Sequence, residues 1–416
     1  MKIALVTPRF IKEDMRGGEE VIRSLYNSMA CSNEVSILTS NAYDIKGEHS
    51  ILGKFVSKED KVITTNEQIV NYIPSFPFIS ELLYYLRYPL VYSLEKLRVK
   101  PYSFYIMDFM RIYGWGPYIP GIKNEILPNR YDIVHASIFP TTSAYLALKY
   151  ANESGTPFVF TPYYHYLKSE FNVSKILSKM LKKSQAIVAC TNREADELYK
   201  IGASPETTHV IPLGFDSAQL KQYGLSKELA RYKLGIGEGA FTILTHPWIG
   251  KGGGTVFKAA VKLSNQQTDV TLLTIGEPDK SYLEMRGLVN TSNLQQIDLG
   301  WVQKEAKWLA FYACDVFAMP SINDSFGLSY LNAWAAEKPV IAAKNSFAED
   351  IVIDKINGFL VEHSDCESIF RILLELSKDI NNGLLLGKNG KAILDKNYSE
   401  KEMSRSYAKL FESLVF

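Results

Sequence analysis

The sequence has too few cysteines, too widely spaced, for a disulfide framework or a zinc site. Its four cysteines, Cys31, Cys190, Cys314 and Cys366, are scattered over 416 residues without a CxxC pair or a metal-like Cys/His spacing. Small secreted domains held by disulfides carry many more cysteines at closer intervals. The pattern therefore favours a reducing compartment and predicts no metal ligands.

The chain also has no surplus of either charge and no long hydrophobic run. The 46 Lys and Arg against 45 Asp and Glu leave a net charge of +1, whereas a general nucleic-acid binder normally carries a basic surplus. No apolar run reaches the roughly 20 residues of a spanning helix, and the start MKIALVTPRF does not resemble a secretory signal. We expect a cytoplasmic protein, either soluble or at the inner face of a membrane, that binds no nucleic acid.

Aromatic residues, by contrast, are abundant and concentrated in one segment. They make up 12% of the chain, and residues 72–118 hold nine Tyr, four Phe and Trp115, with five Lys or Arg and three Asp or Glu. Aromatic rings together with cations suit a membrane interface or a lipid-linked acceptor. The alternative is a helical insertion in which the tyrosines form a half-buried core. Both interpretations stay open at this point.

Short apolar strands alternate with helical segments in two successive series. The first series of predicted strands lies at 3–7, 34–40, 131–137, 156–162, 186–190 and 209–214, and the second at 241–246, 270–276, 294–300, 316–321, 338–343 and 358–362. This alternation predicts an α/β fold with parallel sheets covered by helices on both faces. We expect two doubly wound domains, over 1–215 and 216–395, and a terminal helix at 396–416 that crosses back to the first domain. Ligands of such sheets bind at the carboxyl ends of the strands.

Two glycine-containing segments are candidates for phosphate binding. Gly17 and Gly18 open the first helix, where free N–H groups attract anions, although the spacing GxGxxG is absent and a plain turn is the alternative. The stretch GKGGGT (250–255) fails as a phosphate loop because Thr245 stands where Gly is required and Gly252 where Ser or Thr is required. Lys251 remains a candidate cation for an anionic ligand, against the alternative of a solvated loop lysine.

The segment 320–341 predicts a strand end, an acidic loop, a helix and another strand. Phe326, Gly327 and Leu328 would present N–H groups at the start of the helix, where an anion can bind. Asp324 lies in the loop and Asn332 one turn into the helix, on a side that can face the same ligand. The alternative is that Asp324 caps the helix and Asn332 is a surface amide.

The order of these segments is similar to that of the GT-B glycosyltransferases of family 4, retaining enzymes that use nucleotide sugars. The resemblance covers most of the chain and is weakest at about 41–130. It depends on GGEEVIRSLYNSMA, on IVHAS followed by GTPFVFTPYYH, on READELYKIGA with VIPLGFD, on FYACDVFAMPS, and on SFGLSYLNAWAAEKPVI with NGFLV. It implies two Rossmann-like domains that face each other across a cleft, with the acceptor on the first and the nucleotide sugar on the second.

The resemblance assigns roles to the candidate residues. It implies that Gly17 and Gly18 approach the donor diphosphate and that Lys251 balances its charge. Asp324 and Asn332 occupy the ends of the family's Glu-x7-Glu motif, the first toward the donor sugar and the second toward the ribose. We expect no metal to be required, because Lys251 and helix-start N–H groups can stabilise the departing diphosphate.

Several positions depart from the family pattern. His165 lies near the position of the active-site histidine, although Tyr163 can occupy that position instead. His246 stands where an arginine is usual, and histidine is cationic only below about pH 6.5 unless its surroundings raise its pKa. Glu337 and the pair Lys344-Asn345 replace usual glycines. These departures predict a shifted donor preference or reduced activity.

The sequence therefore predicts a retaining hexosyltransferase that moves a sugar from a nucleotide-diphosphate sugar to a glycan, a lipid-linked acceptor or a small molecule. Residues 72–118 are the candidate for a peripheral membrane contact. Two alternatives stay open: a non-catalytic GT-B scaffold that binds nucleotide sugars, favoured by the substitutions at Asp324, Asn332 and His246, and a sugar-nucleotide epimerase.

Overall fold

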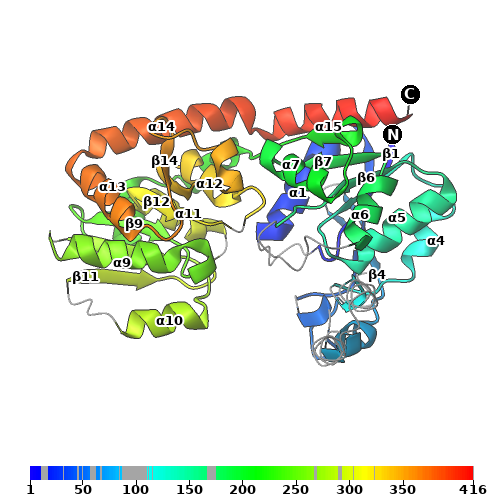
Figure 1. Ribbon diagram of the computed structural model, residues 1–416, viewed down its shortest axis with the longest axis horizontal. Coiled ribbons are helices and arrows are strands. Elements are labelled where there is room, and N and C mark those ends of the chain that lie inside the picture. The colour runs from blue at the N-terminus through cyan, green and yellow to red at the C-terminus, as the bar shows by residue number, and fades with distance from the viewer. Residues whose placement is uncertain are drawn as a thin grey trace. The chain divides into compact units, whose positions relative to one another are not determined.

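The chain folds into two compact units, each with its own sheet (Figure 1). Unit 1 comprises Met1–Gly214 and Glu400–Phe416, and unit 2 comprises Phe215–Ser399. The computed structural model describes residues 1–10, 17–30, 32–44, 46–48, 50–56, 62–65, 68–83, 85–86, 110, 112–114, 116–165, 175–266, 269–288, 293–302, 304–322 and 324–415. The prediction of two Rossmann-like α/β domains is confirmed.

The described residues of unit 1 form an eight-stranded sheet in the order β3-β4-β2-β1-β5-β6-β7-β8. The strands are β1 Lys2–Val6, β2 Glu34–Ser40, β3 Val62–Thr65, β4 Gln68–Ile73, β5 Ile133–Ser137, β6 Phe158–Thr161, β7 Ala186–Ala189 and β8 Thr208–Val210. Among the described strands of this sheet, β3 and β4 pair antiparallel and all other neighbours pair parallel. The first strand pairs with β2 on one side and β5 on the other, so that Ile3 lies opposite both Val35 and Ile133.

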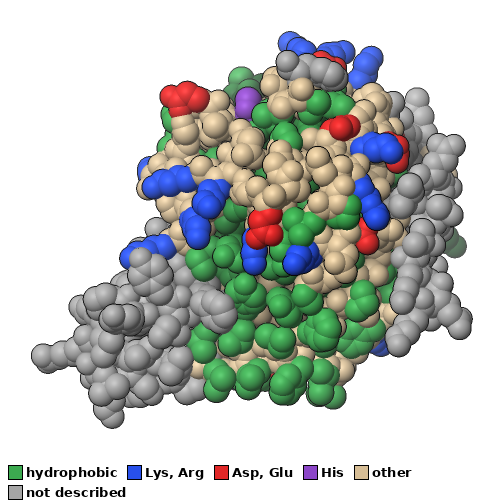
Figure 2. All heavy atoms as spheres, turned by 90° about the vertical axis from the view of Figure 1, so that its right-hand side faces the viewer, with side chains coloured by type: hydrophobic (Ala, Val, Ile, Leu, Met, Phe, Trp, Pro, Cys, Tyr) green, Lys and Arg blue, Asp and Glu red, His purple; other side chains and the backbone are tan. Residues whose placement is uncertain are grey.

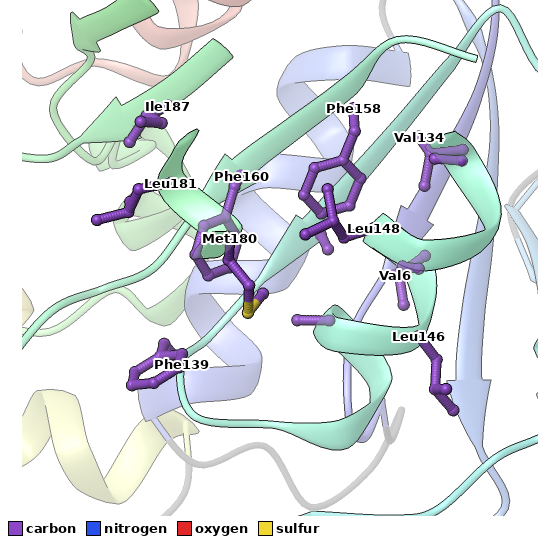
Figure 3. Close-up of a cluster of buried hydrophobic side chains, with 14 of the residues drawn as sticks. Val6, Val134, Phe139, Leu146, Leu148, Phe158, Phe160, Met180, Leu181 and Ile187 are labelled. Atoms are coloured by element: carbon purple, nitrogen blue, oxygen red, sulfur yellow. The ribbon is translucent and has the colours of Figure 1, made fainter. Parts of the chain in front are cut away.

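The helices of unit 1 cover this sheet. They are α1 Gly17–Ala30, α4 Ile122–Ile126, α5 Thr142–Ser154, α6 Lys175–Lys183, α7 Asn192–Ile201 and α15 Glu400–Val415, with short 3-10 turns η1 Lys46–Glu48 and η3 Pro205–Thr207. Figure 3 shows side chains of β1, β5 and β6 packed together with those of α5 and α6. Phe158 and Phe160 point to the same side of β6 because side chains alternate along a strand, and their rings stack at 6.1 Å.

The C-terminal helix α15 packs on unit 1. The His135 ring on β5 lies 5.5 Å from the Tyr407 ring and 6.2 Å from the Phe411 ring, measured between centroids. Tyr407 and Phe411 are both almost completely buried. This apolar contact holds the last helix of the chain against the central strands of the first sheet.

Unit 2 is a six-stranded, all-parallel sheet in the order β11-β10-β9-β12-β13-β14. The strands are β9 Phe241–Thr245, β10 Val270–Thr274, β11 Leu294–Asp298, β12 Val316–Met319, β13 Val340–Ala343 and β14 Gly358–Val361. The helices are α8 Lys227–Leu234, α9 Gly253–Ser264, α10 Lys280–Gly287, α11 Lys304–Ala313, α12 Leu328–Ala335, α13 Cys366–Lys378 and α14 Ile380–Asn397, with 3-10 turns η4 Ser217–Tyr223, η5 Ile249–Lys251 and η6 Phe347–Asp350. From β9 the chain adds strands toward one edge of the sheet (β10, β11), and from β12 it adds them toward the other edge (β13, β14). The switch point lies between β9 and β12, which are hydrogen-bonded neighbours. Ligands of doubly wound sheets bind at this kind of switch point.

A buried charge cluster connects β9 and β12 at their amino ends, away from the carboxyl ends where a ligand would bind. The Asp315 carboxylate, just before β12, accepts a hydrogen bond from the Thr242 backbone N–H on β9 at 2.8 Å. It also pairs with the Arg231 guanidinium of α8 at 2.7 Å, and both of these charged side chains are less than a tenth exposed. Because removing one partner of such a pair leaves a buried charge, this cluster fixes the spacing of the two strands that lead to the switch point.

The aromatic segment 72–118 is described only in part. Residues 84, 87–109, 111 and 115 lie outside the described residues. Within the described part, Tyr72 is buried on β4 and Phe78 is exposed in a helical turn. None of the described helices has the length and the apolar composition that crossing a membrane requires.

Candidate functional site

The loops that follow β9 and β12 come together at the switch point of unit 2. A Cβ atom placed on Gly252, in the first loop, would lie 2.5 Å from the Pro320 ring in the second. Gly252 also has φ +79°, a conformation that other residues rarely adopt. The two loops therefore touch through backbone, and a glycine is needed at the contact.

Glycine also shapes the start of α9. A Cβ on Gly253 would lie 2.1 Å from the His246 carbonyl oxygen and 2.9 Å from the Trp248 nitrogen. The Gly253 N–H donates to the Trp248 carbonyl at 2.9 Å, which closes the turn that contains Lys251. This packing role of Gly253 could not be predicted from the stretch GKGGGT, because sequence spacing alone does not show which backbone segments lie in contact.

Lys251 and Asp324 form an ion pair across the two loops. The Lys251 ammonium donates to Asp324 Oδ1 at 3.1 Å, and the two side chains are 30% and 21% exposed. Lys251 is therefore held against the second loop, which differs from the solvated lysine of the alternative interpretation. The structure thus brings together Lys251 and Asp324, two residues of unit 2 that we predict to be catalytic, as we do His165 of unit 1.

His246 lies beside this pair and is held by two hydrogen bonds. Its Nδ1 lies 2.8 Å from the Ile275 carbonyl oxygen, so Nδ1 carries the proton and donates it. Its Nε2 lies 3.1 Å from Ser329 Oγ and accepts from that hydroxyl in the neutral ring. Burial, and next the charge of Lys251, lower the pKa of His246 to about 4. A neutral imidazole thus stands at the position where the resemblance implies a fixed positive charge.

The helix α12 begins at the same place. Gly327 is its N-cap residue, with φ +94°, and no side chain among the described residues caps the helix there. The N-cap residue is therefore Gly327 and not Asp324, the residue that the alternative interpretation proposed, and Asp324 Oδ1 accepts a hydrogen bond from Lys251. The uncapped N–H groups after Gly327 form the positive end of the α12 dipole, next to the Lys251–Asp324 pair.

Buried residues fix the position of this helix. Phe326 is 1% exposed and packs edge-on against the Tyr398 ring at 5.8 Å. Asn332 is 6% exposed, so it is not a surface amide. It lies four residues after Leu328, which places both on one face of α12. Its predicted contact with a ribose stays a prediction.

The remaining predicted site residues belong to unit 1. Gly17 and Gly18 begin α1 on the carboxyl side of β1. His165 is half-buried and follows β6, two positions away from β1 in the sheet. Because β1, β5 and β6 are parallel, these residues follow the same edge of the sheet.

Glu194 is a residue whose position the sequence analysis missed. It is completely buried, and its carboxylate accepts the backbone N–H groups of Tyr164 and Cys190, each at 2.6 Å. Burial raises its pKa to about 7. It thereby connects the residues just before His165 to the residues just before α7. The sequence carried a signal, since Glu194 follows the helix-capping Thr191 by three residues, the spacing of a capping box.

Two known protein families match parts of the chain. Residues 247–392 match the family described as glycosyl transferases group 1, and residues 82–219 match glycosyltransferase family 4. A D-inositol 3-phosphate glycosyltransferase of Xylanimonas cellulosilytica is 29% identical over 196 residues, 45% of this chain and 47% of that protein. An alpha-monoglucosyldiacylglycerol synthase of Streptococcus pneumoniae is 31% identical over 191 residues, 43% of this chain and 42% of that protein. The chain thus matches about half the length of these relatives.

Similar solved structures extend over the whole chain. The Anabaena protein HepE in complex with UDP-glucose superposes with a TM-score of 0.71 at 16% identity, covering 99% of this chain and 100% of that one. Sucrose-phosphate synthase from Thermosynechococcus elongatus has a TM-score of 0.68 at 17% identity, covering 99% and 98%. At these identities the likeness establishes the fold.

Proposed function

Because the chain belongs to the GT-B glycosyltransferases of family 4, we propose that it is a retaining hexosyltransferase. In this proposal a nucleotide-diphosphate sugar is the donor, and a glycan, a lipid-linked molecule or a small molecule is the acceptor. The observation that carries the proposal is the Lys251–Asp324 pair at the switch point of unit 2, beside the uncapped start of α12. The UDP-glucose bound to the similar HepE structure supports a nucleotide sugar as the ligand class.

The proposed chemistry depends on stabilising negative charge as the nucleoside diphosphate leaves. An ammonium and the N–H groups of a helix start can do this in a partly buried site without a metal. Asp324 holds the Lys251 side chain in place before the donor binds. When a diphosphate engages Lys251, the Asp324 carboxylate can accept hydrogen bonds from the donor sugar hydroxyls.

The other site residues have supporting roles in the proposal. Asn332 hydrogen-bonds the ribose diol, without the charge-assisted bond that a carboxylate would give. Gly17 and Gly18 let backbone approach the donor diphosphate. His165 orients a sugar hydroxyl or relays a proton. These roles are taken from the family resemblance.

The proposal is tested by incubating the full chain with a panel of nucleotide sugars and an acceptor extract. Release of nucleoside diphosphate that depends on acceptor is expected with at least one donor, UDP-glucose being the first to try. The anomeric configuration of the glycoside, determined by NMR, should be that of the donor. An inverted product would contradict the retaining mechanism, and no release with any donor would contradict the enzyme.

A non-catalytic nucleotide-sugar binder is the second candidate. The neutral ring at His246 favours it, because a fixed cation usual in the family is absent from the site. Calorimetry that detects donor binding, together with no turnover over the whole panel, would support this candidate. Turnover with any donor would exclude it.

The neutral state of His246 predicts a flat pH response. Between pH 8 and pH 6 the affinity for the sugar nucleotide that binds should change by no more than about twofold, because a group with a pKa of about 4 stays neutral there. Titration calorimetry of the wild type and of His246→Asn, whose amide can still donate to the Ile275 carbonyl, measures this. Binding that strengthens as the pH falls through 6.5 in the wild type alone would show that His246 becomes a cation toward the diphosphate.

A further inference from the structure

One face of unit 1 exposes an apolar patch that no described element covers. We define the apolar patch by six exposed side chains, Ile51, Leu52, Phe76, Phe78, Leu82 and Leu86. Leu52 is 73% and Phe78 63% exposed. Single exposed apolar residues are normal on protein surfaces, but a contiguous group marks a surface that contacts something.

The apolar patch comes from two segments of the chain that are hydrogen-bonded to each other, one around Ile51 and the other around Glu81. Glu81, in the helical residues 77–83, accepts hydrogen bonds from the Ser50 hydroxyl at 3.0 Å and the Ile51 N–H at 3.2 Å. The loop with Ile51 and Leu52 is therefore held against the turn with Phe78 and Leu82. Figure 2 shows hydrophobic side chains gathered along the lower edge of this side of the molecule.

In the helical residues 77–83, a serine faces the protein interior and large apolar side chains face outward, the opposite of a normal surface helix. Ser80 is completely buried and donates to the Gly116 carbonyl at 3.1 Å, whereas Phe78 and Leu82 on either side of it are exposed. A surface helix of a water-soluble protein normally buries its leucines and exposes its serines. The reversed orientation is held by a specific hydrogen bond, so the outward apolar side is part of the fold.

A chain of aromatic rings connects the patch to a basic groove. Phe76 lies 6.3 Å from Tyr118, Tyr118 lies 5.9 Å from Tyr113, and Tyr113 lies 6.1 Å from Tyr145, between ring centroids. Tyr145 is on α5, and it lines a surface groove between α5 and α6. The patch and the groove are thus linked by packed, partly buried aromatic rings within unit 1.

The groove carries a surplus of positive charge. The described residues that line it include Lys149, Lys179 and Lys183, and one acidic residue, Glu153. Within the described part of the chain, neither Lys179 nor Lys183 makes an ion pair. Figure 2 shows Lys and Arg side chains above the hydrophobic edge. An anion is therefore the chemical complement of the groove.

We propose that this face of unit 1 docks on an anionic lipid bilayer. The apolar patch enters the interface, where aromatic and aliphatic side chains are stable at the level of the headgroups. The lysines of the groove contact the phosphates of anionic lipids. A protein partner would explain the patch but not the lysine-lined groove to which the ring contacts link it. Docking itself is independent of catalysis, and only its consequence, that the acceptor is lipid-linked, rests on the proposed function.

The test is flotation of the full chain with vesicles of phosphatidylcholine, with and without phosphatidylglycerol. We expect recovery with the vesicles that contain phosphatidylglycerol, and less at high salt because salt screens the lysines. The variant Lys149→Gln/Lys179→Gln/Lys183→Gln should bind those vesicles on the order of 100-fold more weakly. The variant Phe78→Ser/Leu82→Ser should lose at least about 10-fold. All five positions lie outside the proposed donor site.

A matched control distinguishes docking through the apolar patch from non-specific hydrophobic binding to vesicles. Leu384 and Leu385 are also exposed leucines, but they lie on α14 of unit 2, and Leu384→Ser/Leu385→Ser should float like the wild type. Wild-type protein that floats with neither vesicle, or a Phe78→Ser/Leu82→Ser variant that floats normally, would overturn the proposal. So would a wild-type dimer, without flotation, that the same variant converts to monomer. If flotation fails while nucleoside diphosphate is still released, only the docking proposal fails.

Discussion

Replacing Lys251 with alanine should lower the rate of nucleoside diphosphate release by about 100- to 1000-fold, the effect of removing one preorganised group from a developing negative charge. The loss has two physical sources. The ammonium that would face the diphosphate disappears, and the Asp324 carboxylate, 3.1 Å from it in the native protein, is left to repel the donor. Steady-state kinetics with the active donor measure the change, and KM should rise with the fall in kcat.

Two further variants make this result specific. Lys258→Ala removes an exposed lysine from the same helix, α9, and should change the rate by no more than about twofold. Lys251→Ala/Asp324→Asn removes the uncompensated carboxylate and should recover part of the lost donor affinity without restoring kcat. An equal loss in Lys258→Ala, or full activity in Lys251→Ala, would remove Lys251 from the site.

Replacing Gly253 with alanine should destabilise unit 2 by about 3 kcal/mol, at the upper end of the usual cost of overpacking. The new Cβ would lie 2.1 Å from the His246 carbonyl oxygen, so the start of α9 has to move away from β9. Because Lys251 precedes this position by two residues, activity should fall as well. The midpoint of thermal unfolding, followed by circular dichroism, measures the first effect.

Gly250→Ala is the matched control for this prediction. It lies in the same loop, but a Cβ there meets no atom within 4 Å. Alanine in an unobstructed position reduces the entropy of the unfolded chain, so this variant should be unchanged or slightly more stable. Equal unfolding midpoints for the two variants would contradict the close contact at Gly253.

The sequence predicted the fold well because its signal is local. Alternating apolar strands and amphipathic helices indicate a doubly wound sheet wherever they occur, and both series of strands were found in order. Strand order across a sheet has no such local signal. The neighbourhood of β9 and β12, on which the site depends, could be predicted only through the family resemblance.

The sequence indicated which residues are candidates for the site, but it could not show the contacts between them. Lys251 and Asp324 are 73 residues apart, and nothing in either segment specifies their ion pair. The sequence also could not show that His246 is held neutral. The main cause of its lowered pKa is burial, which depends on the folded surroundings of the ring. The loop glycines were visible, but their role depends on backbone that approaches from another strand.

The aromatic segment illustrates why composition alone left two interpretations open. Tyr72 is buried on β4 and Tyr113 packs between Tyr118 and Tyr145, as the insertion hypothesis expects. Phe76 and Phe78 are exposed, as the membrane hypothesis expects. Aromatic content predicts contact with an apolar environment and does not distinguish a protein core from a bilayer.

The central claim is that unit 2 binds a nucleotide-diphosphate sugar at the ends of β9 and β12, and a crystal structure of the full chain with the sugar nucleotide that supports turnover tests it most directly. We expect a diphosphate within hydrogen-bond distance of Lys251 Nζ and of the backbone N–H groups that follow Gly327, with Asp324 turned to the sugar. A nucleotide whose diphosphate contacts neither Lys251 nor the start of α12 would contradict it.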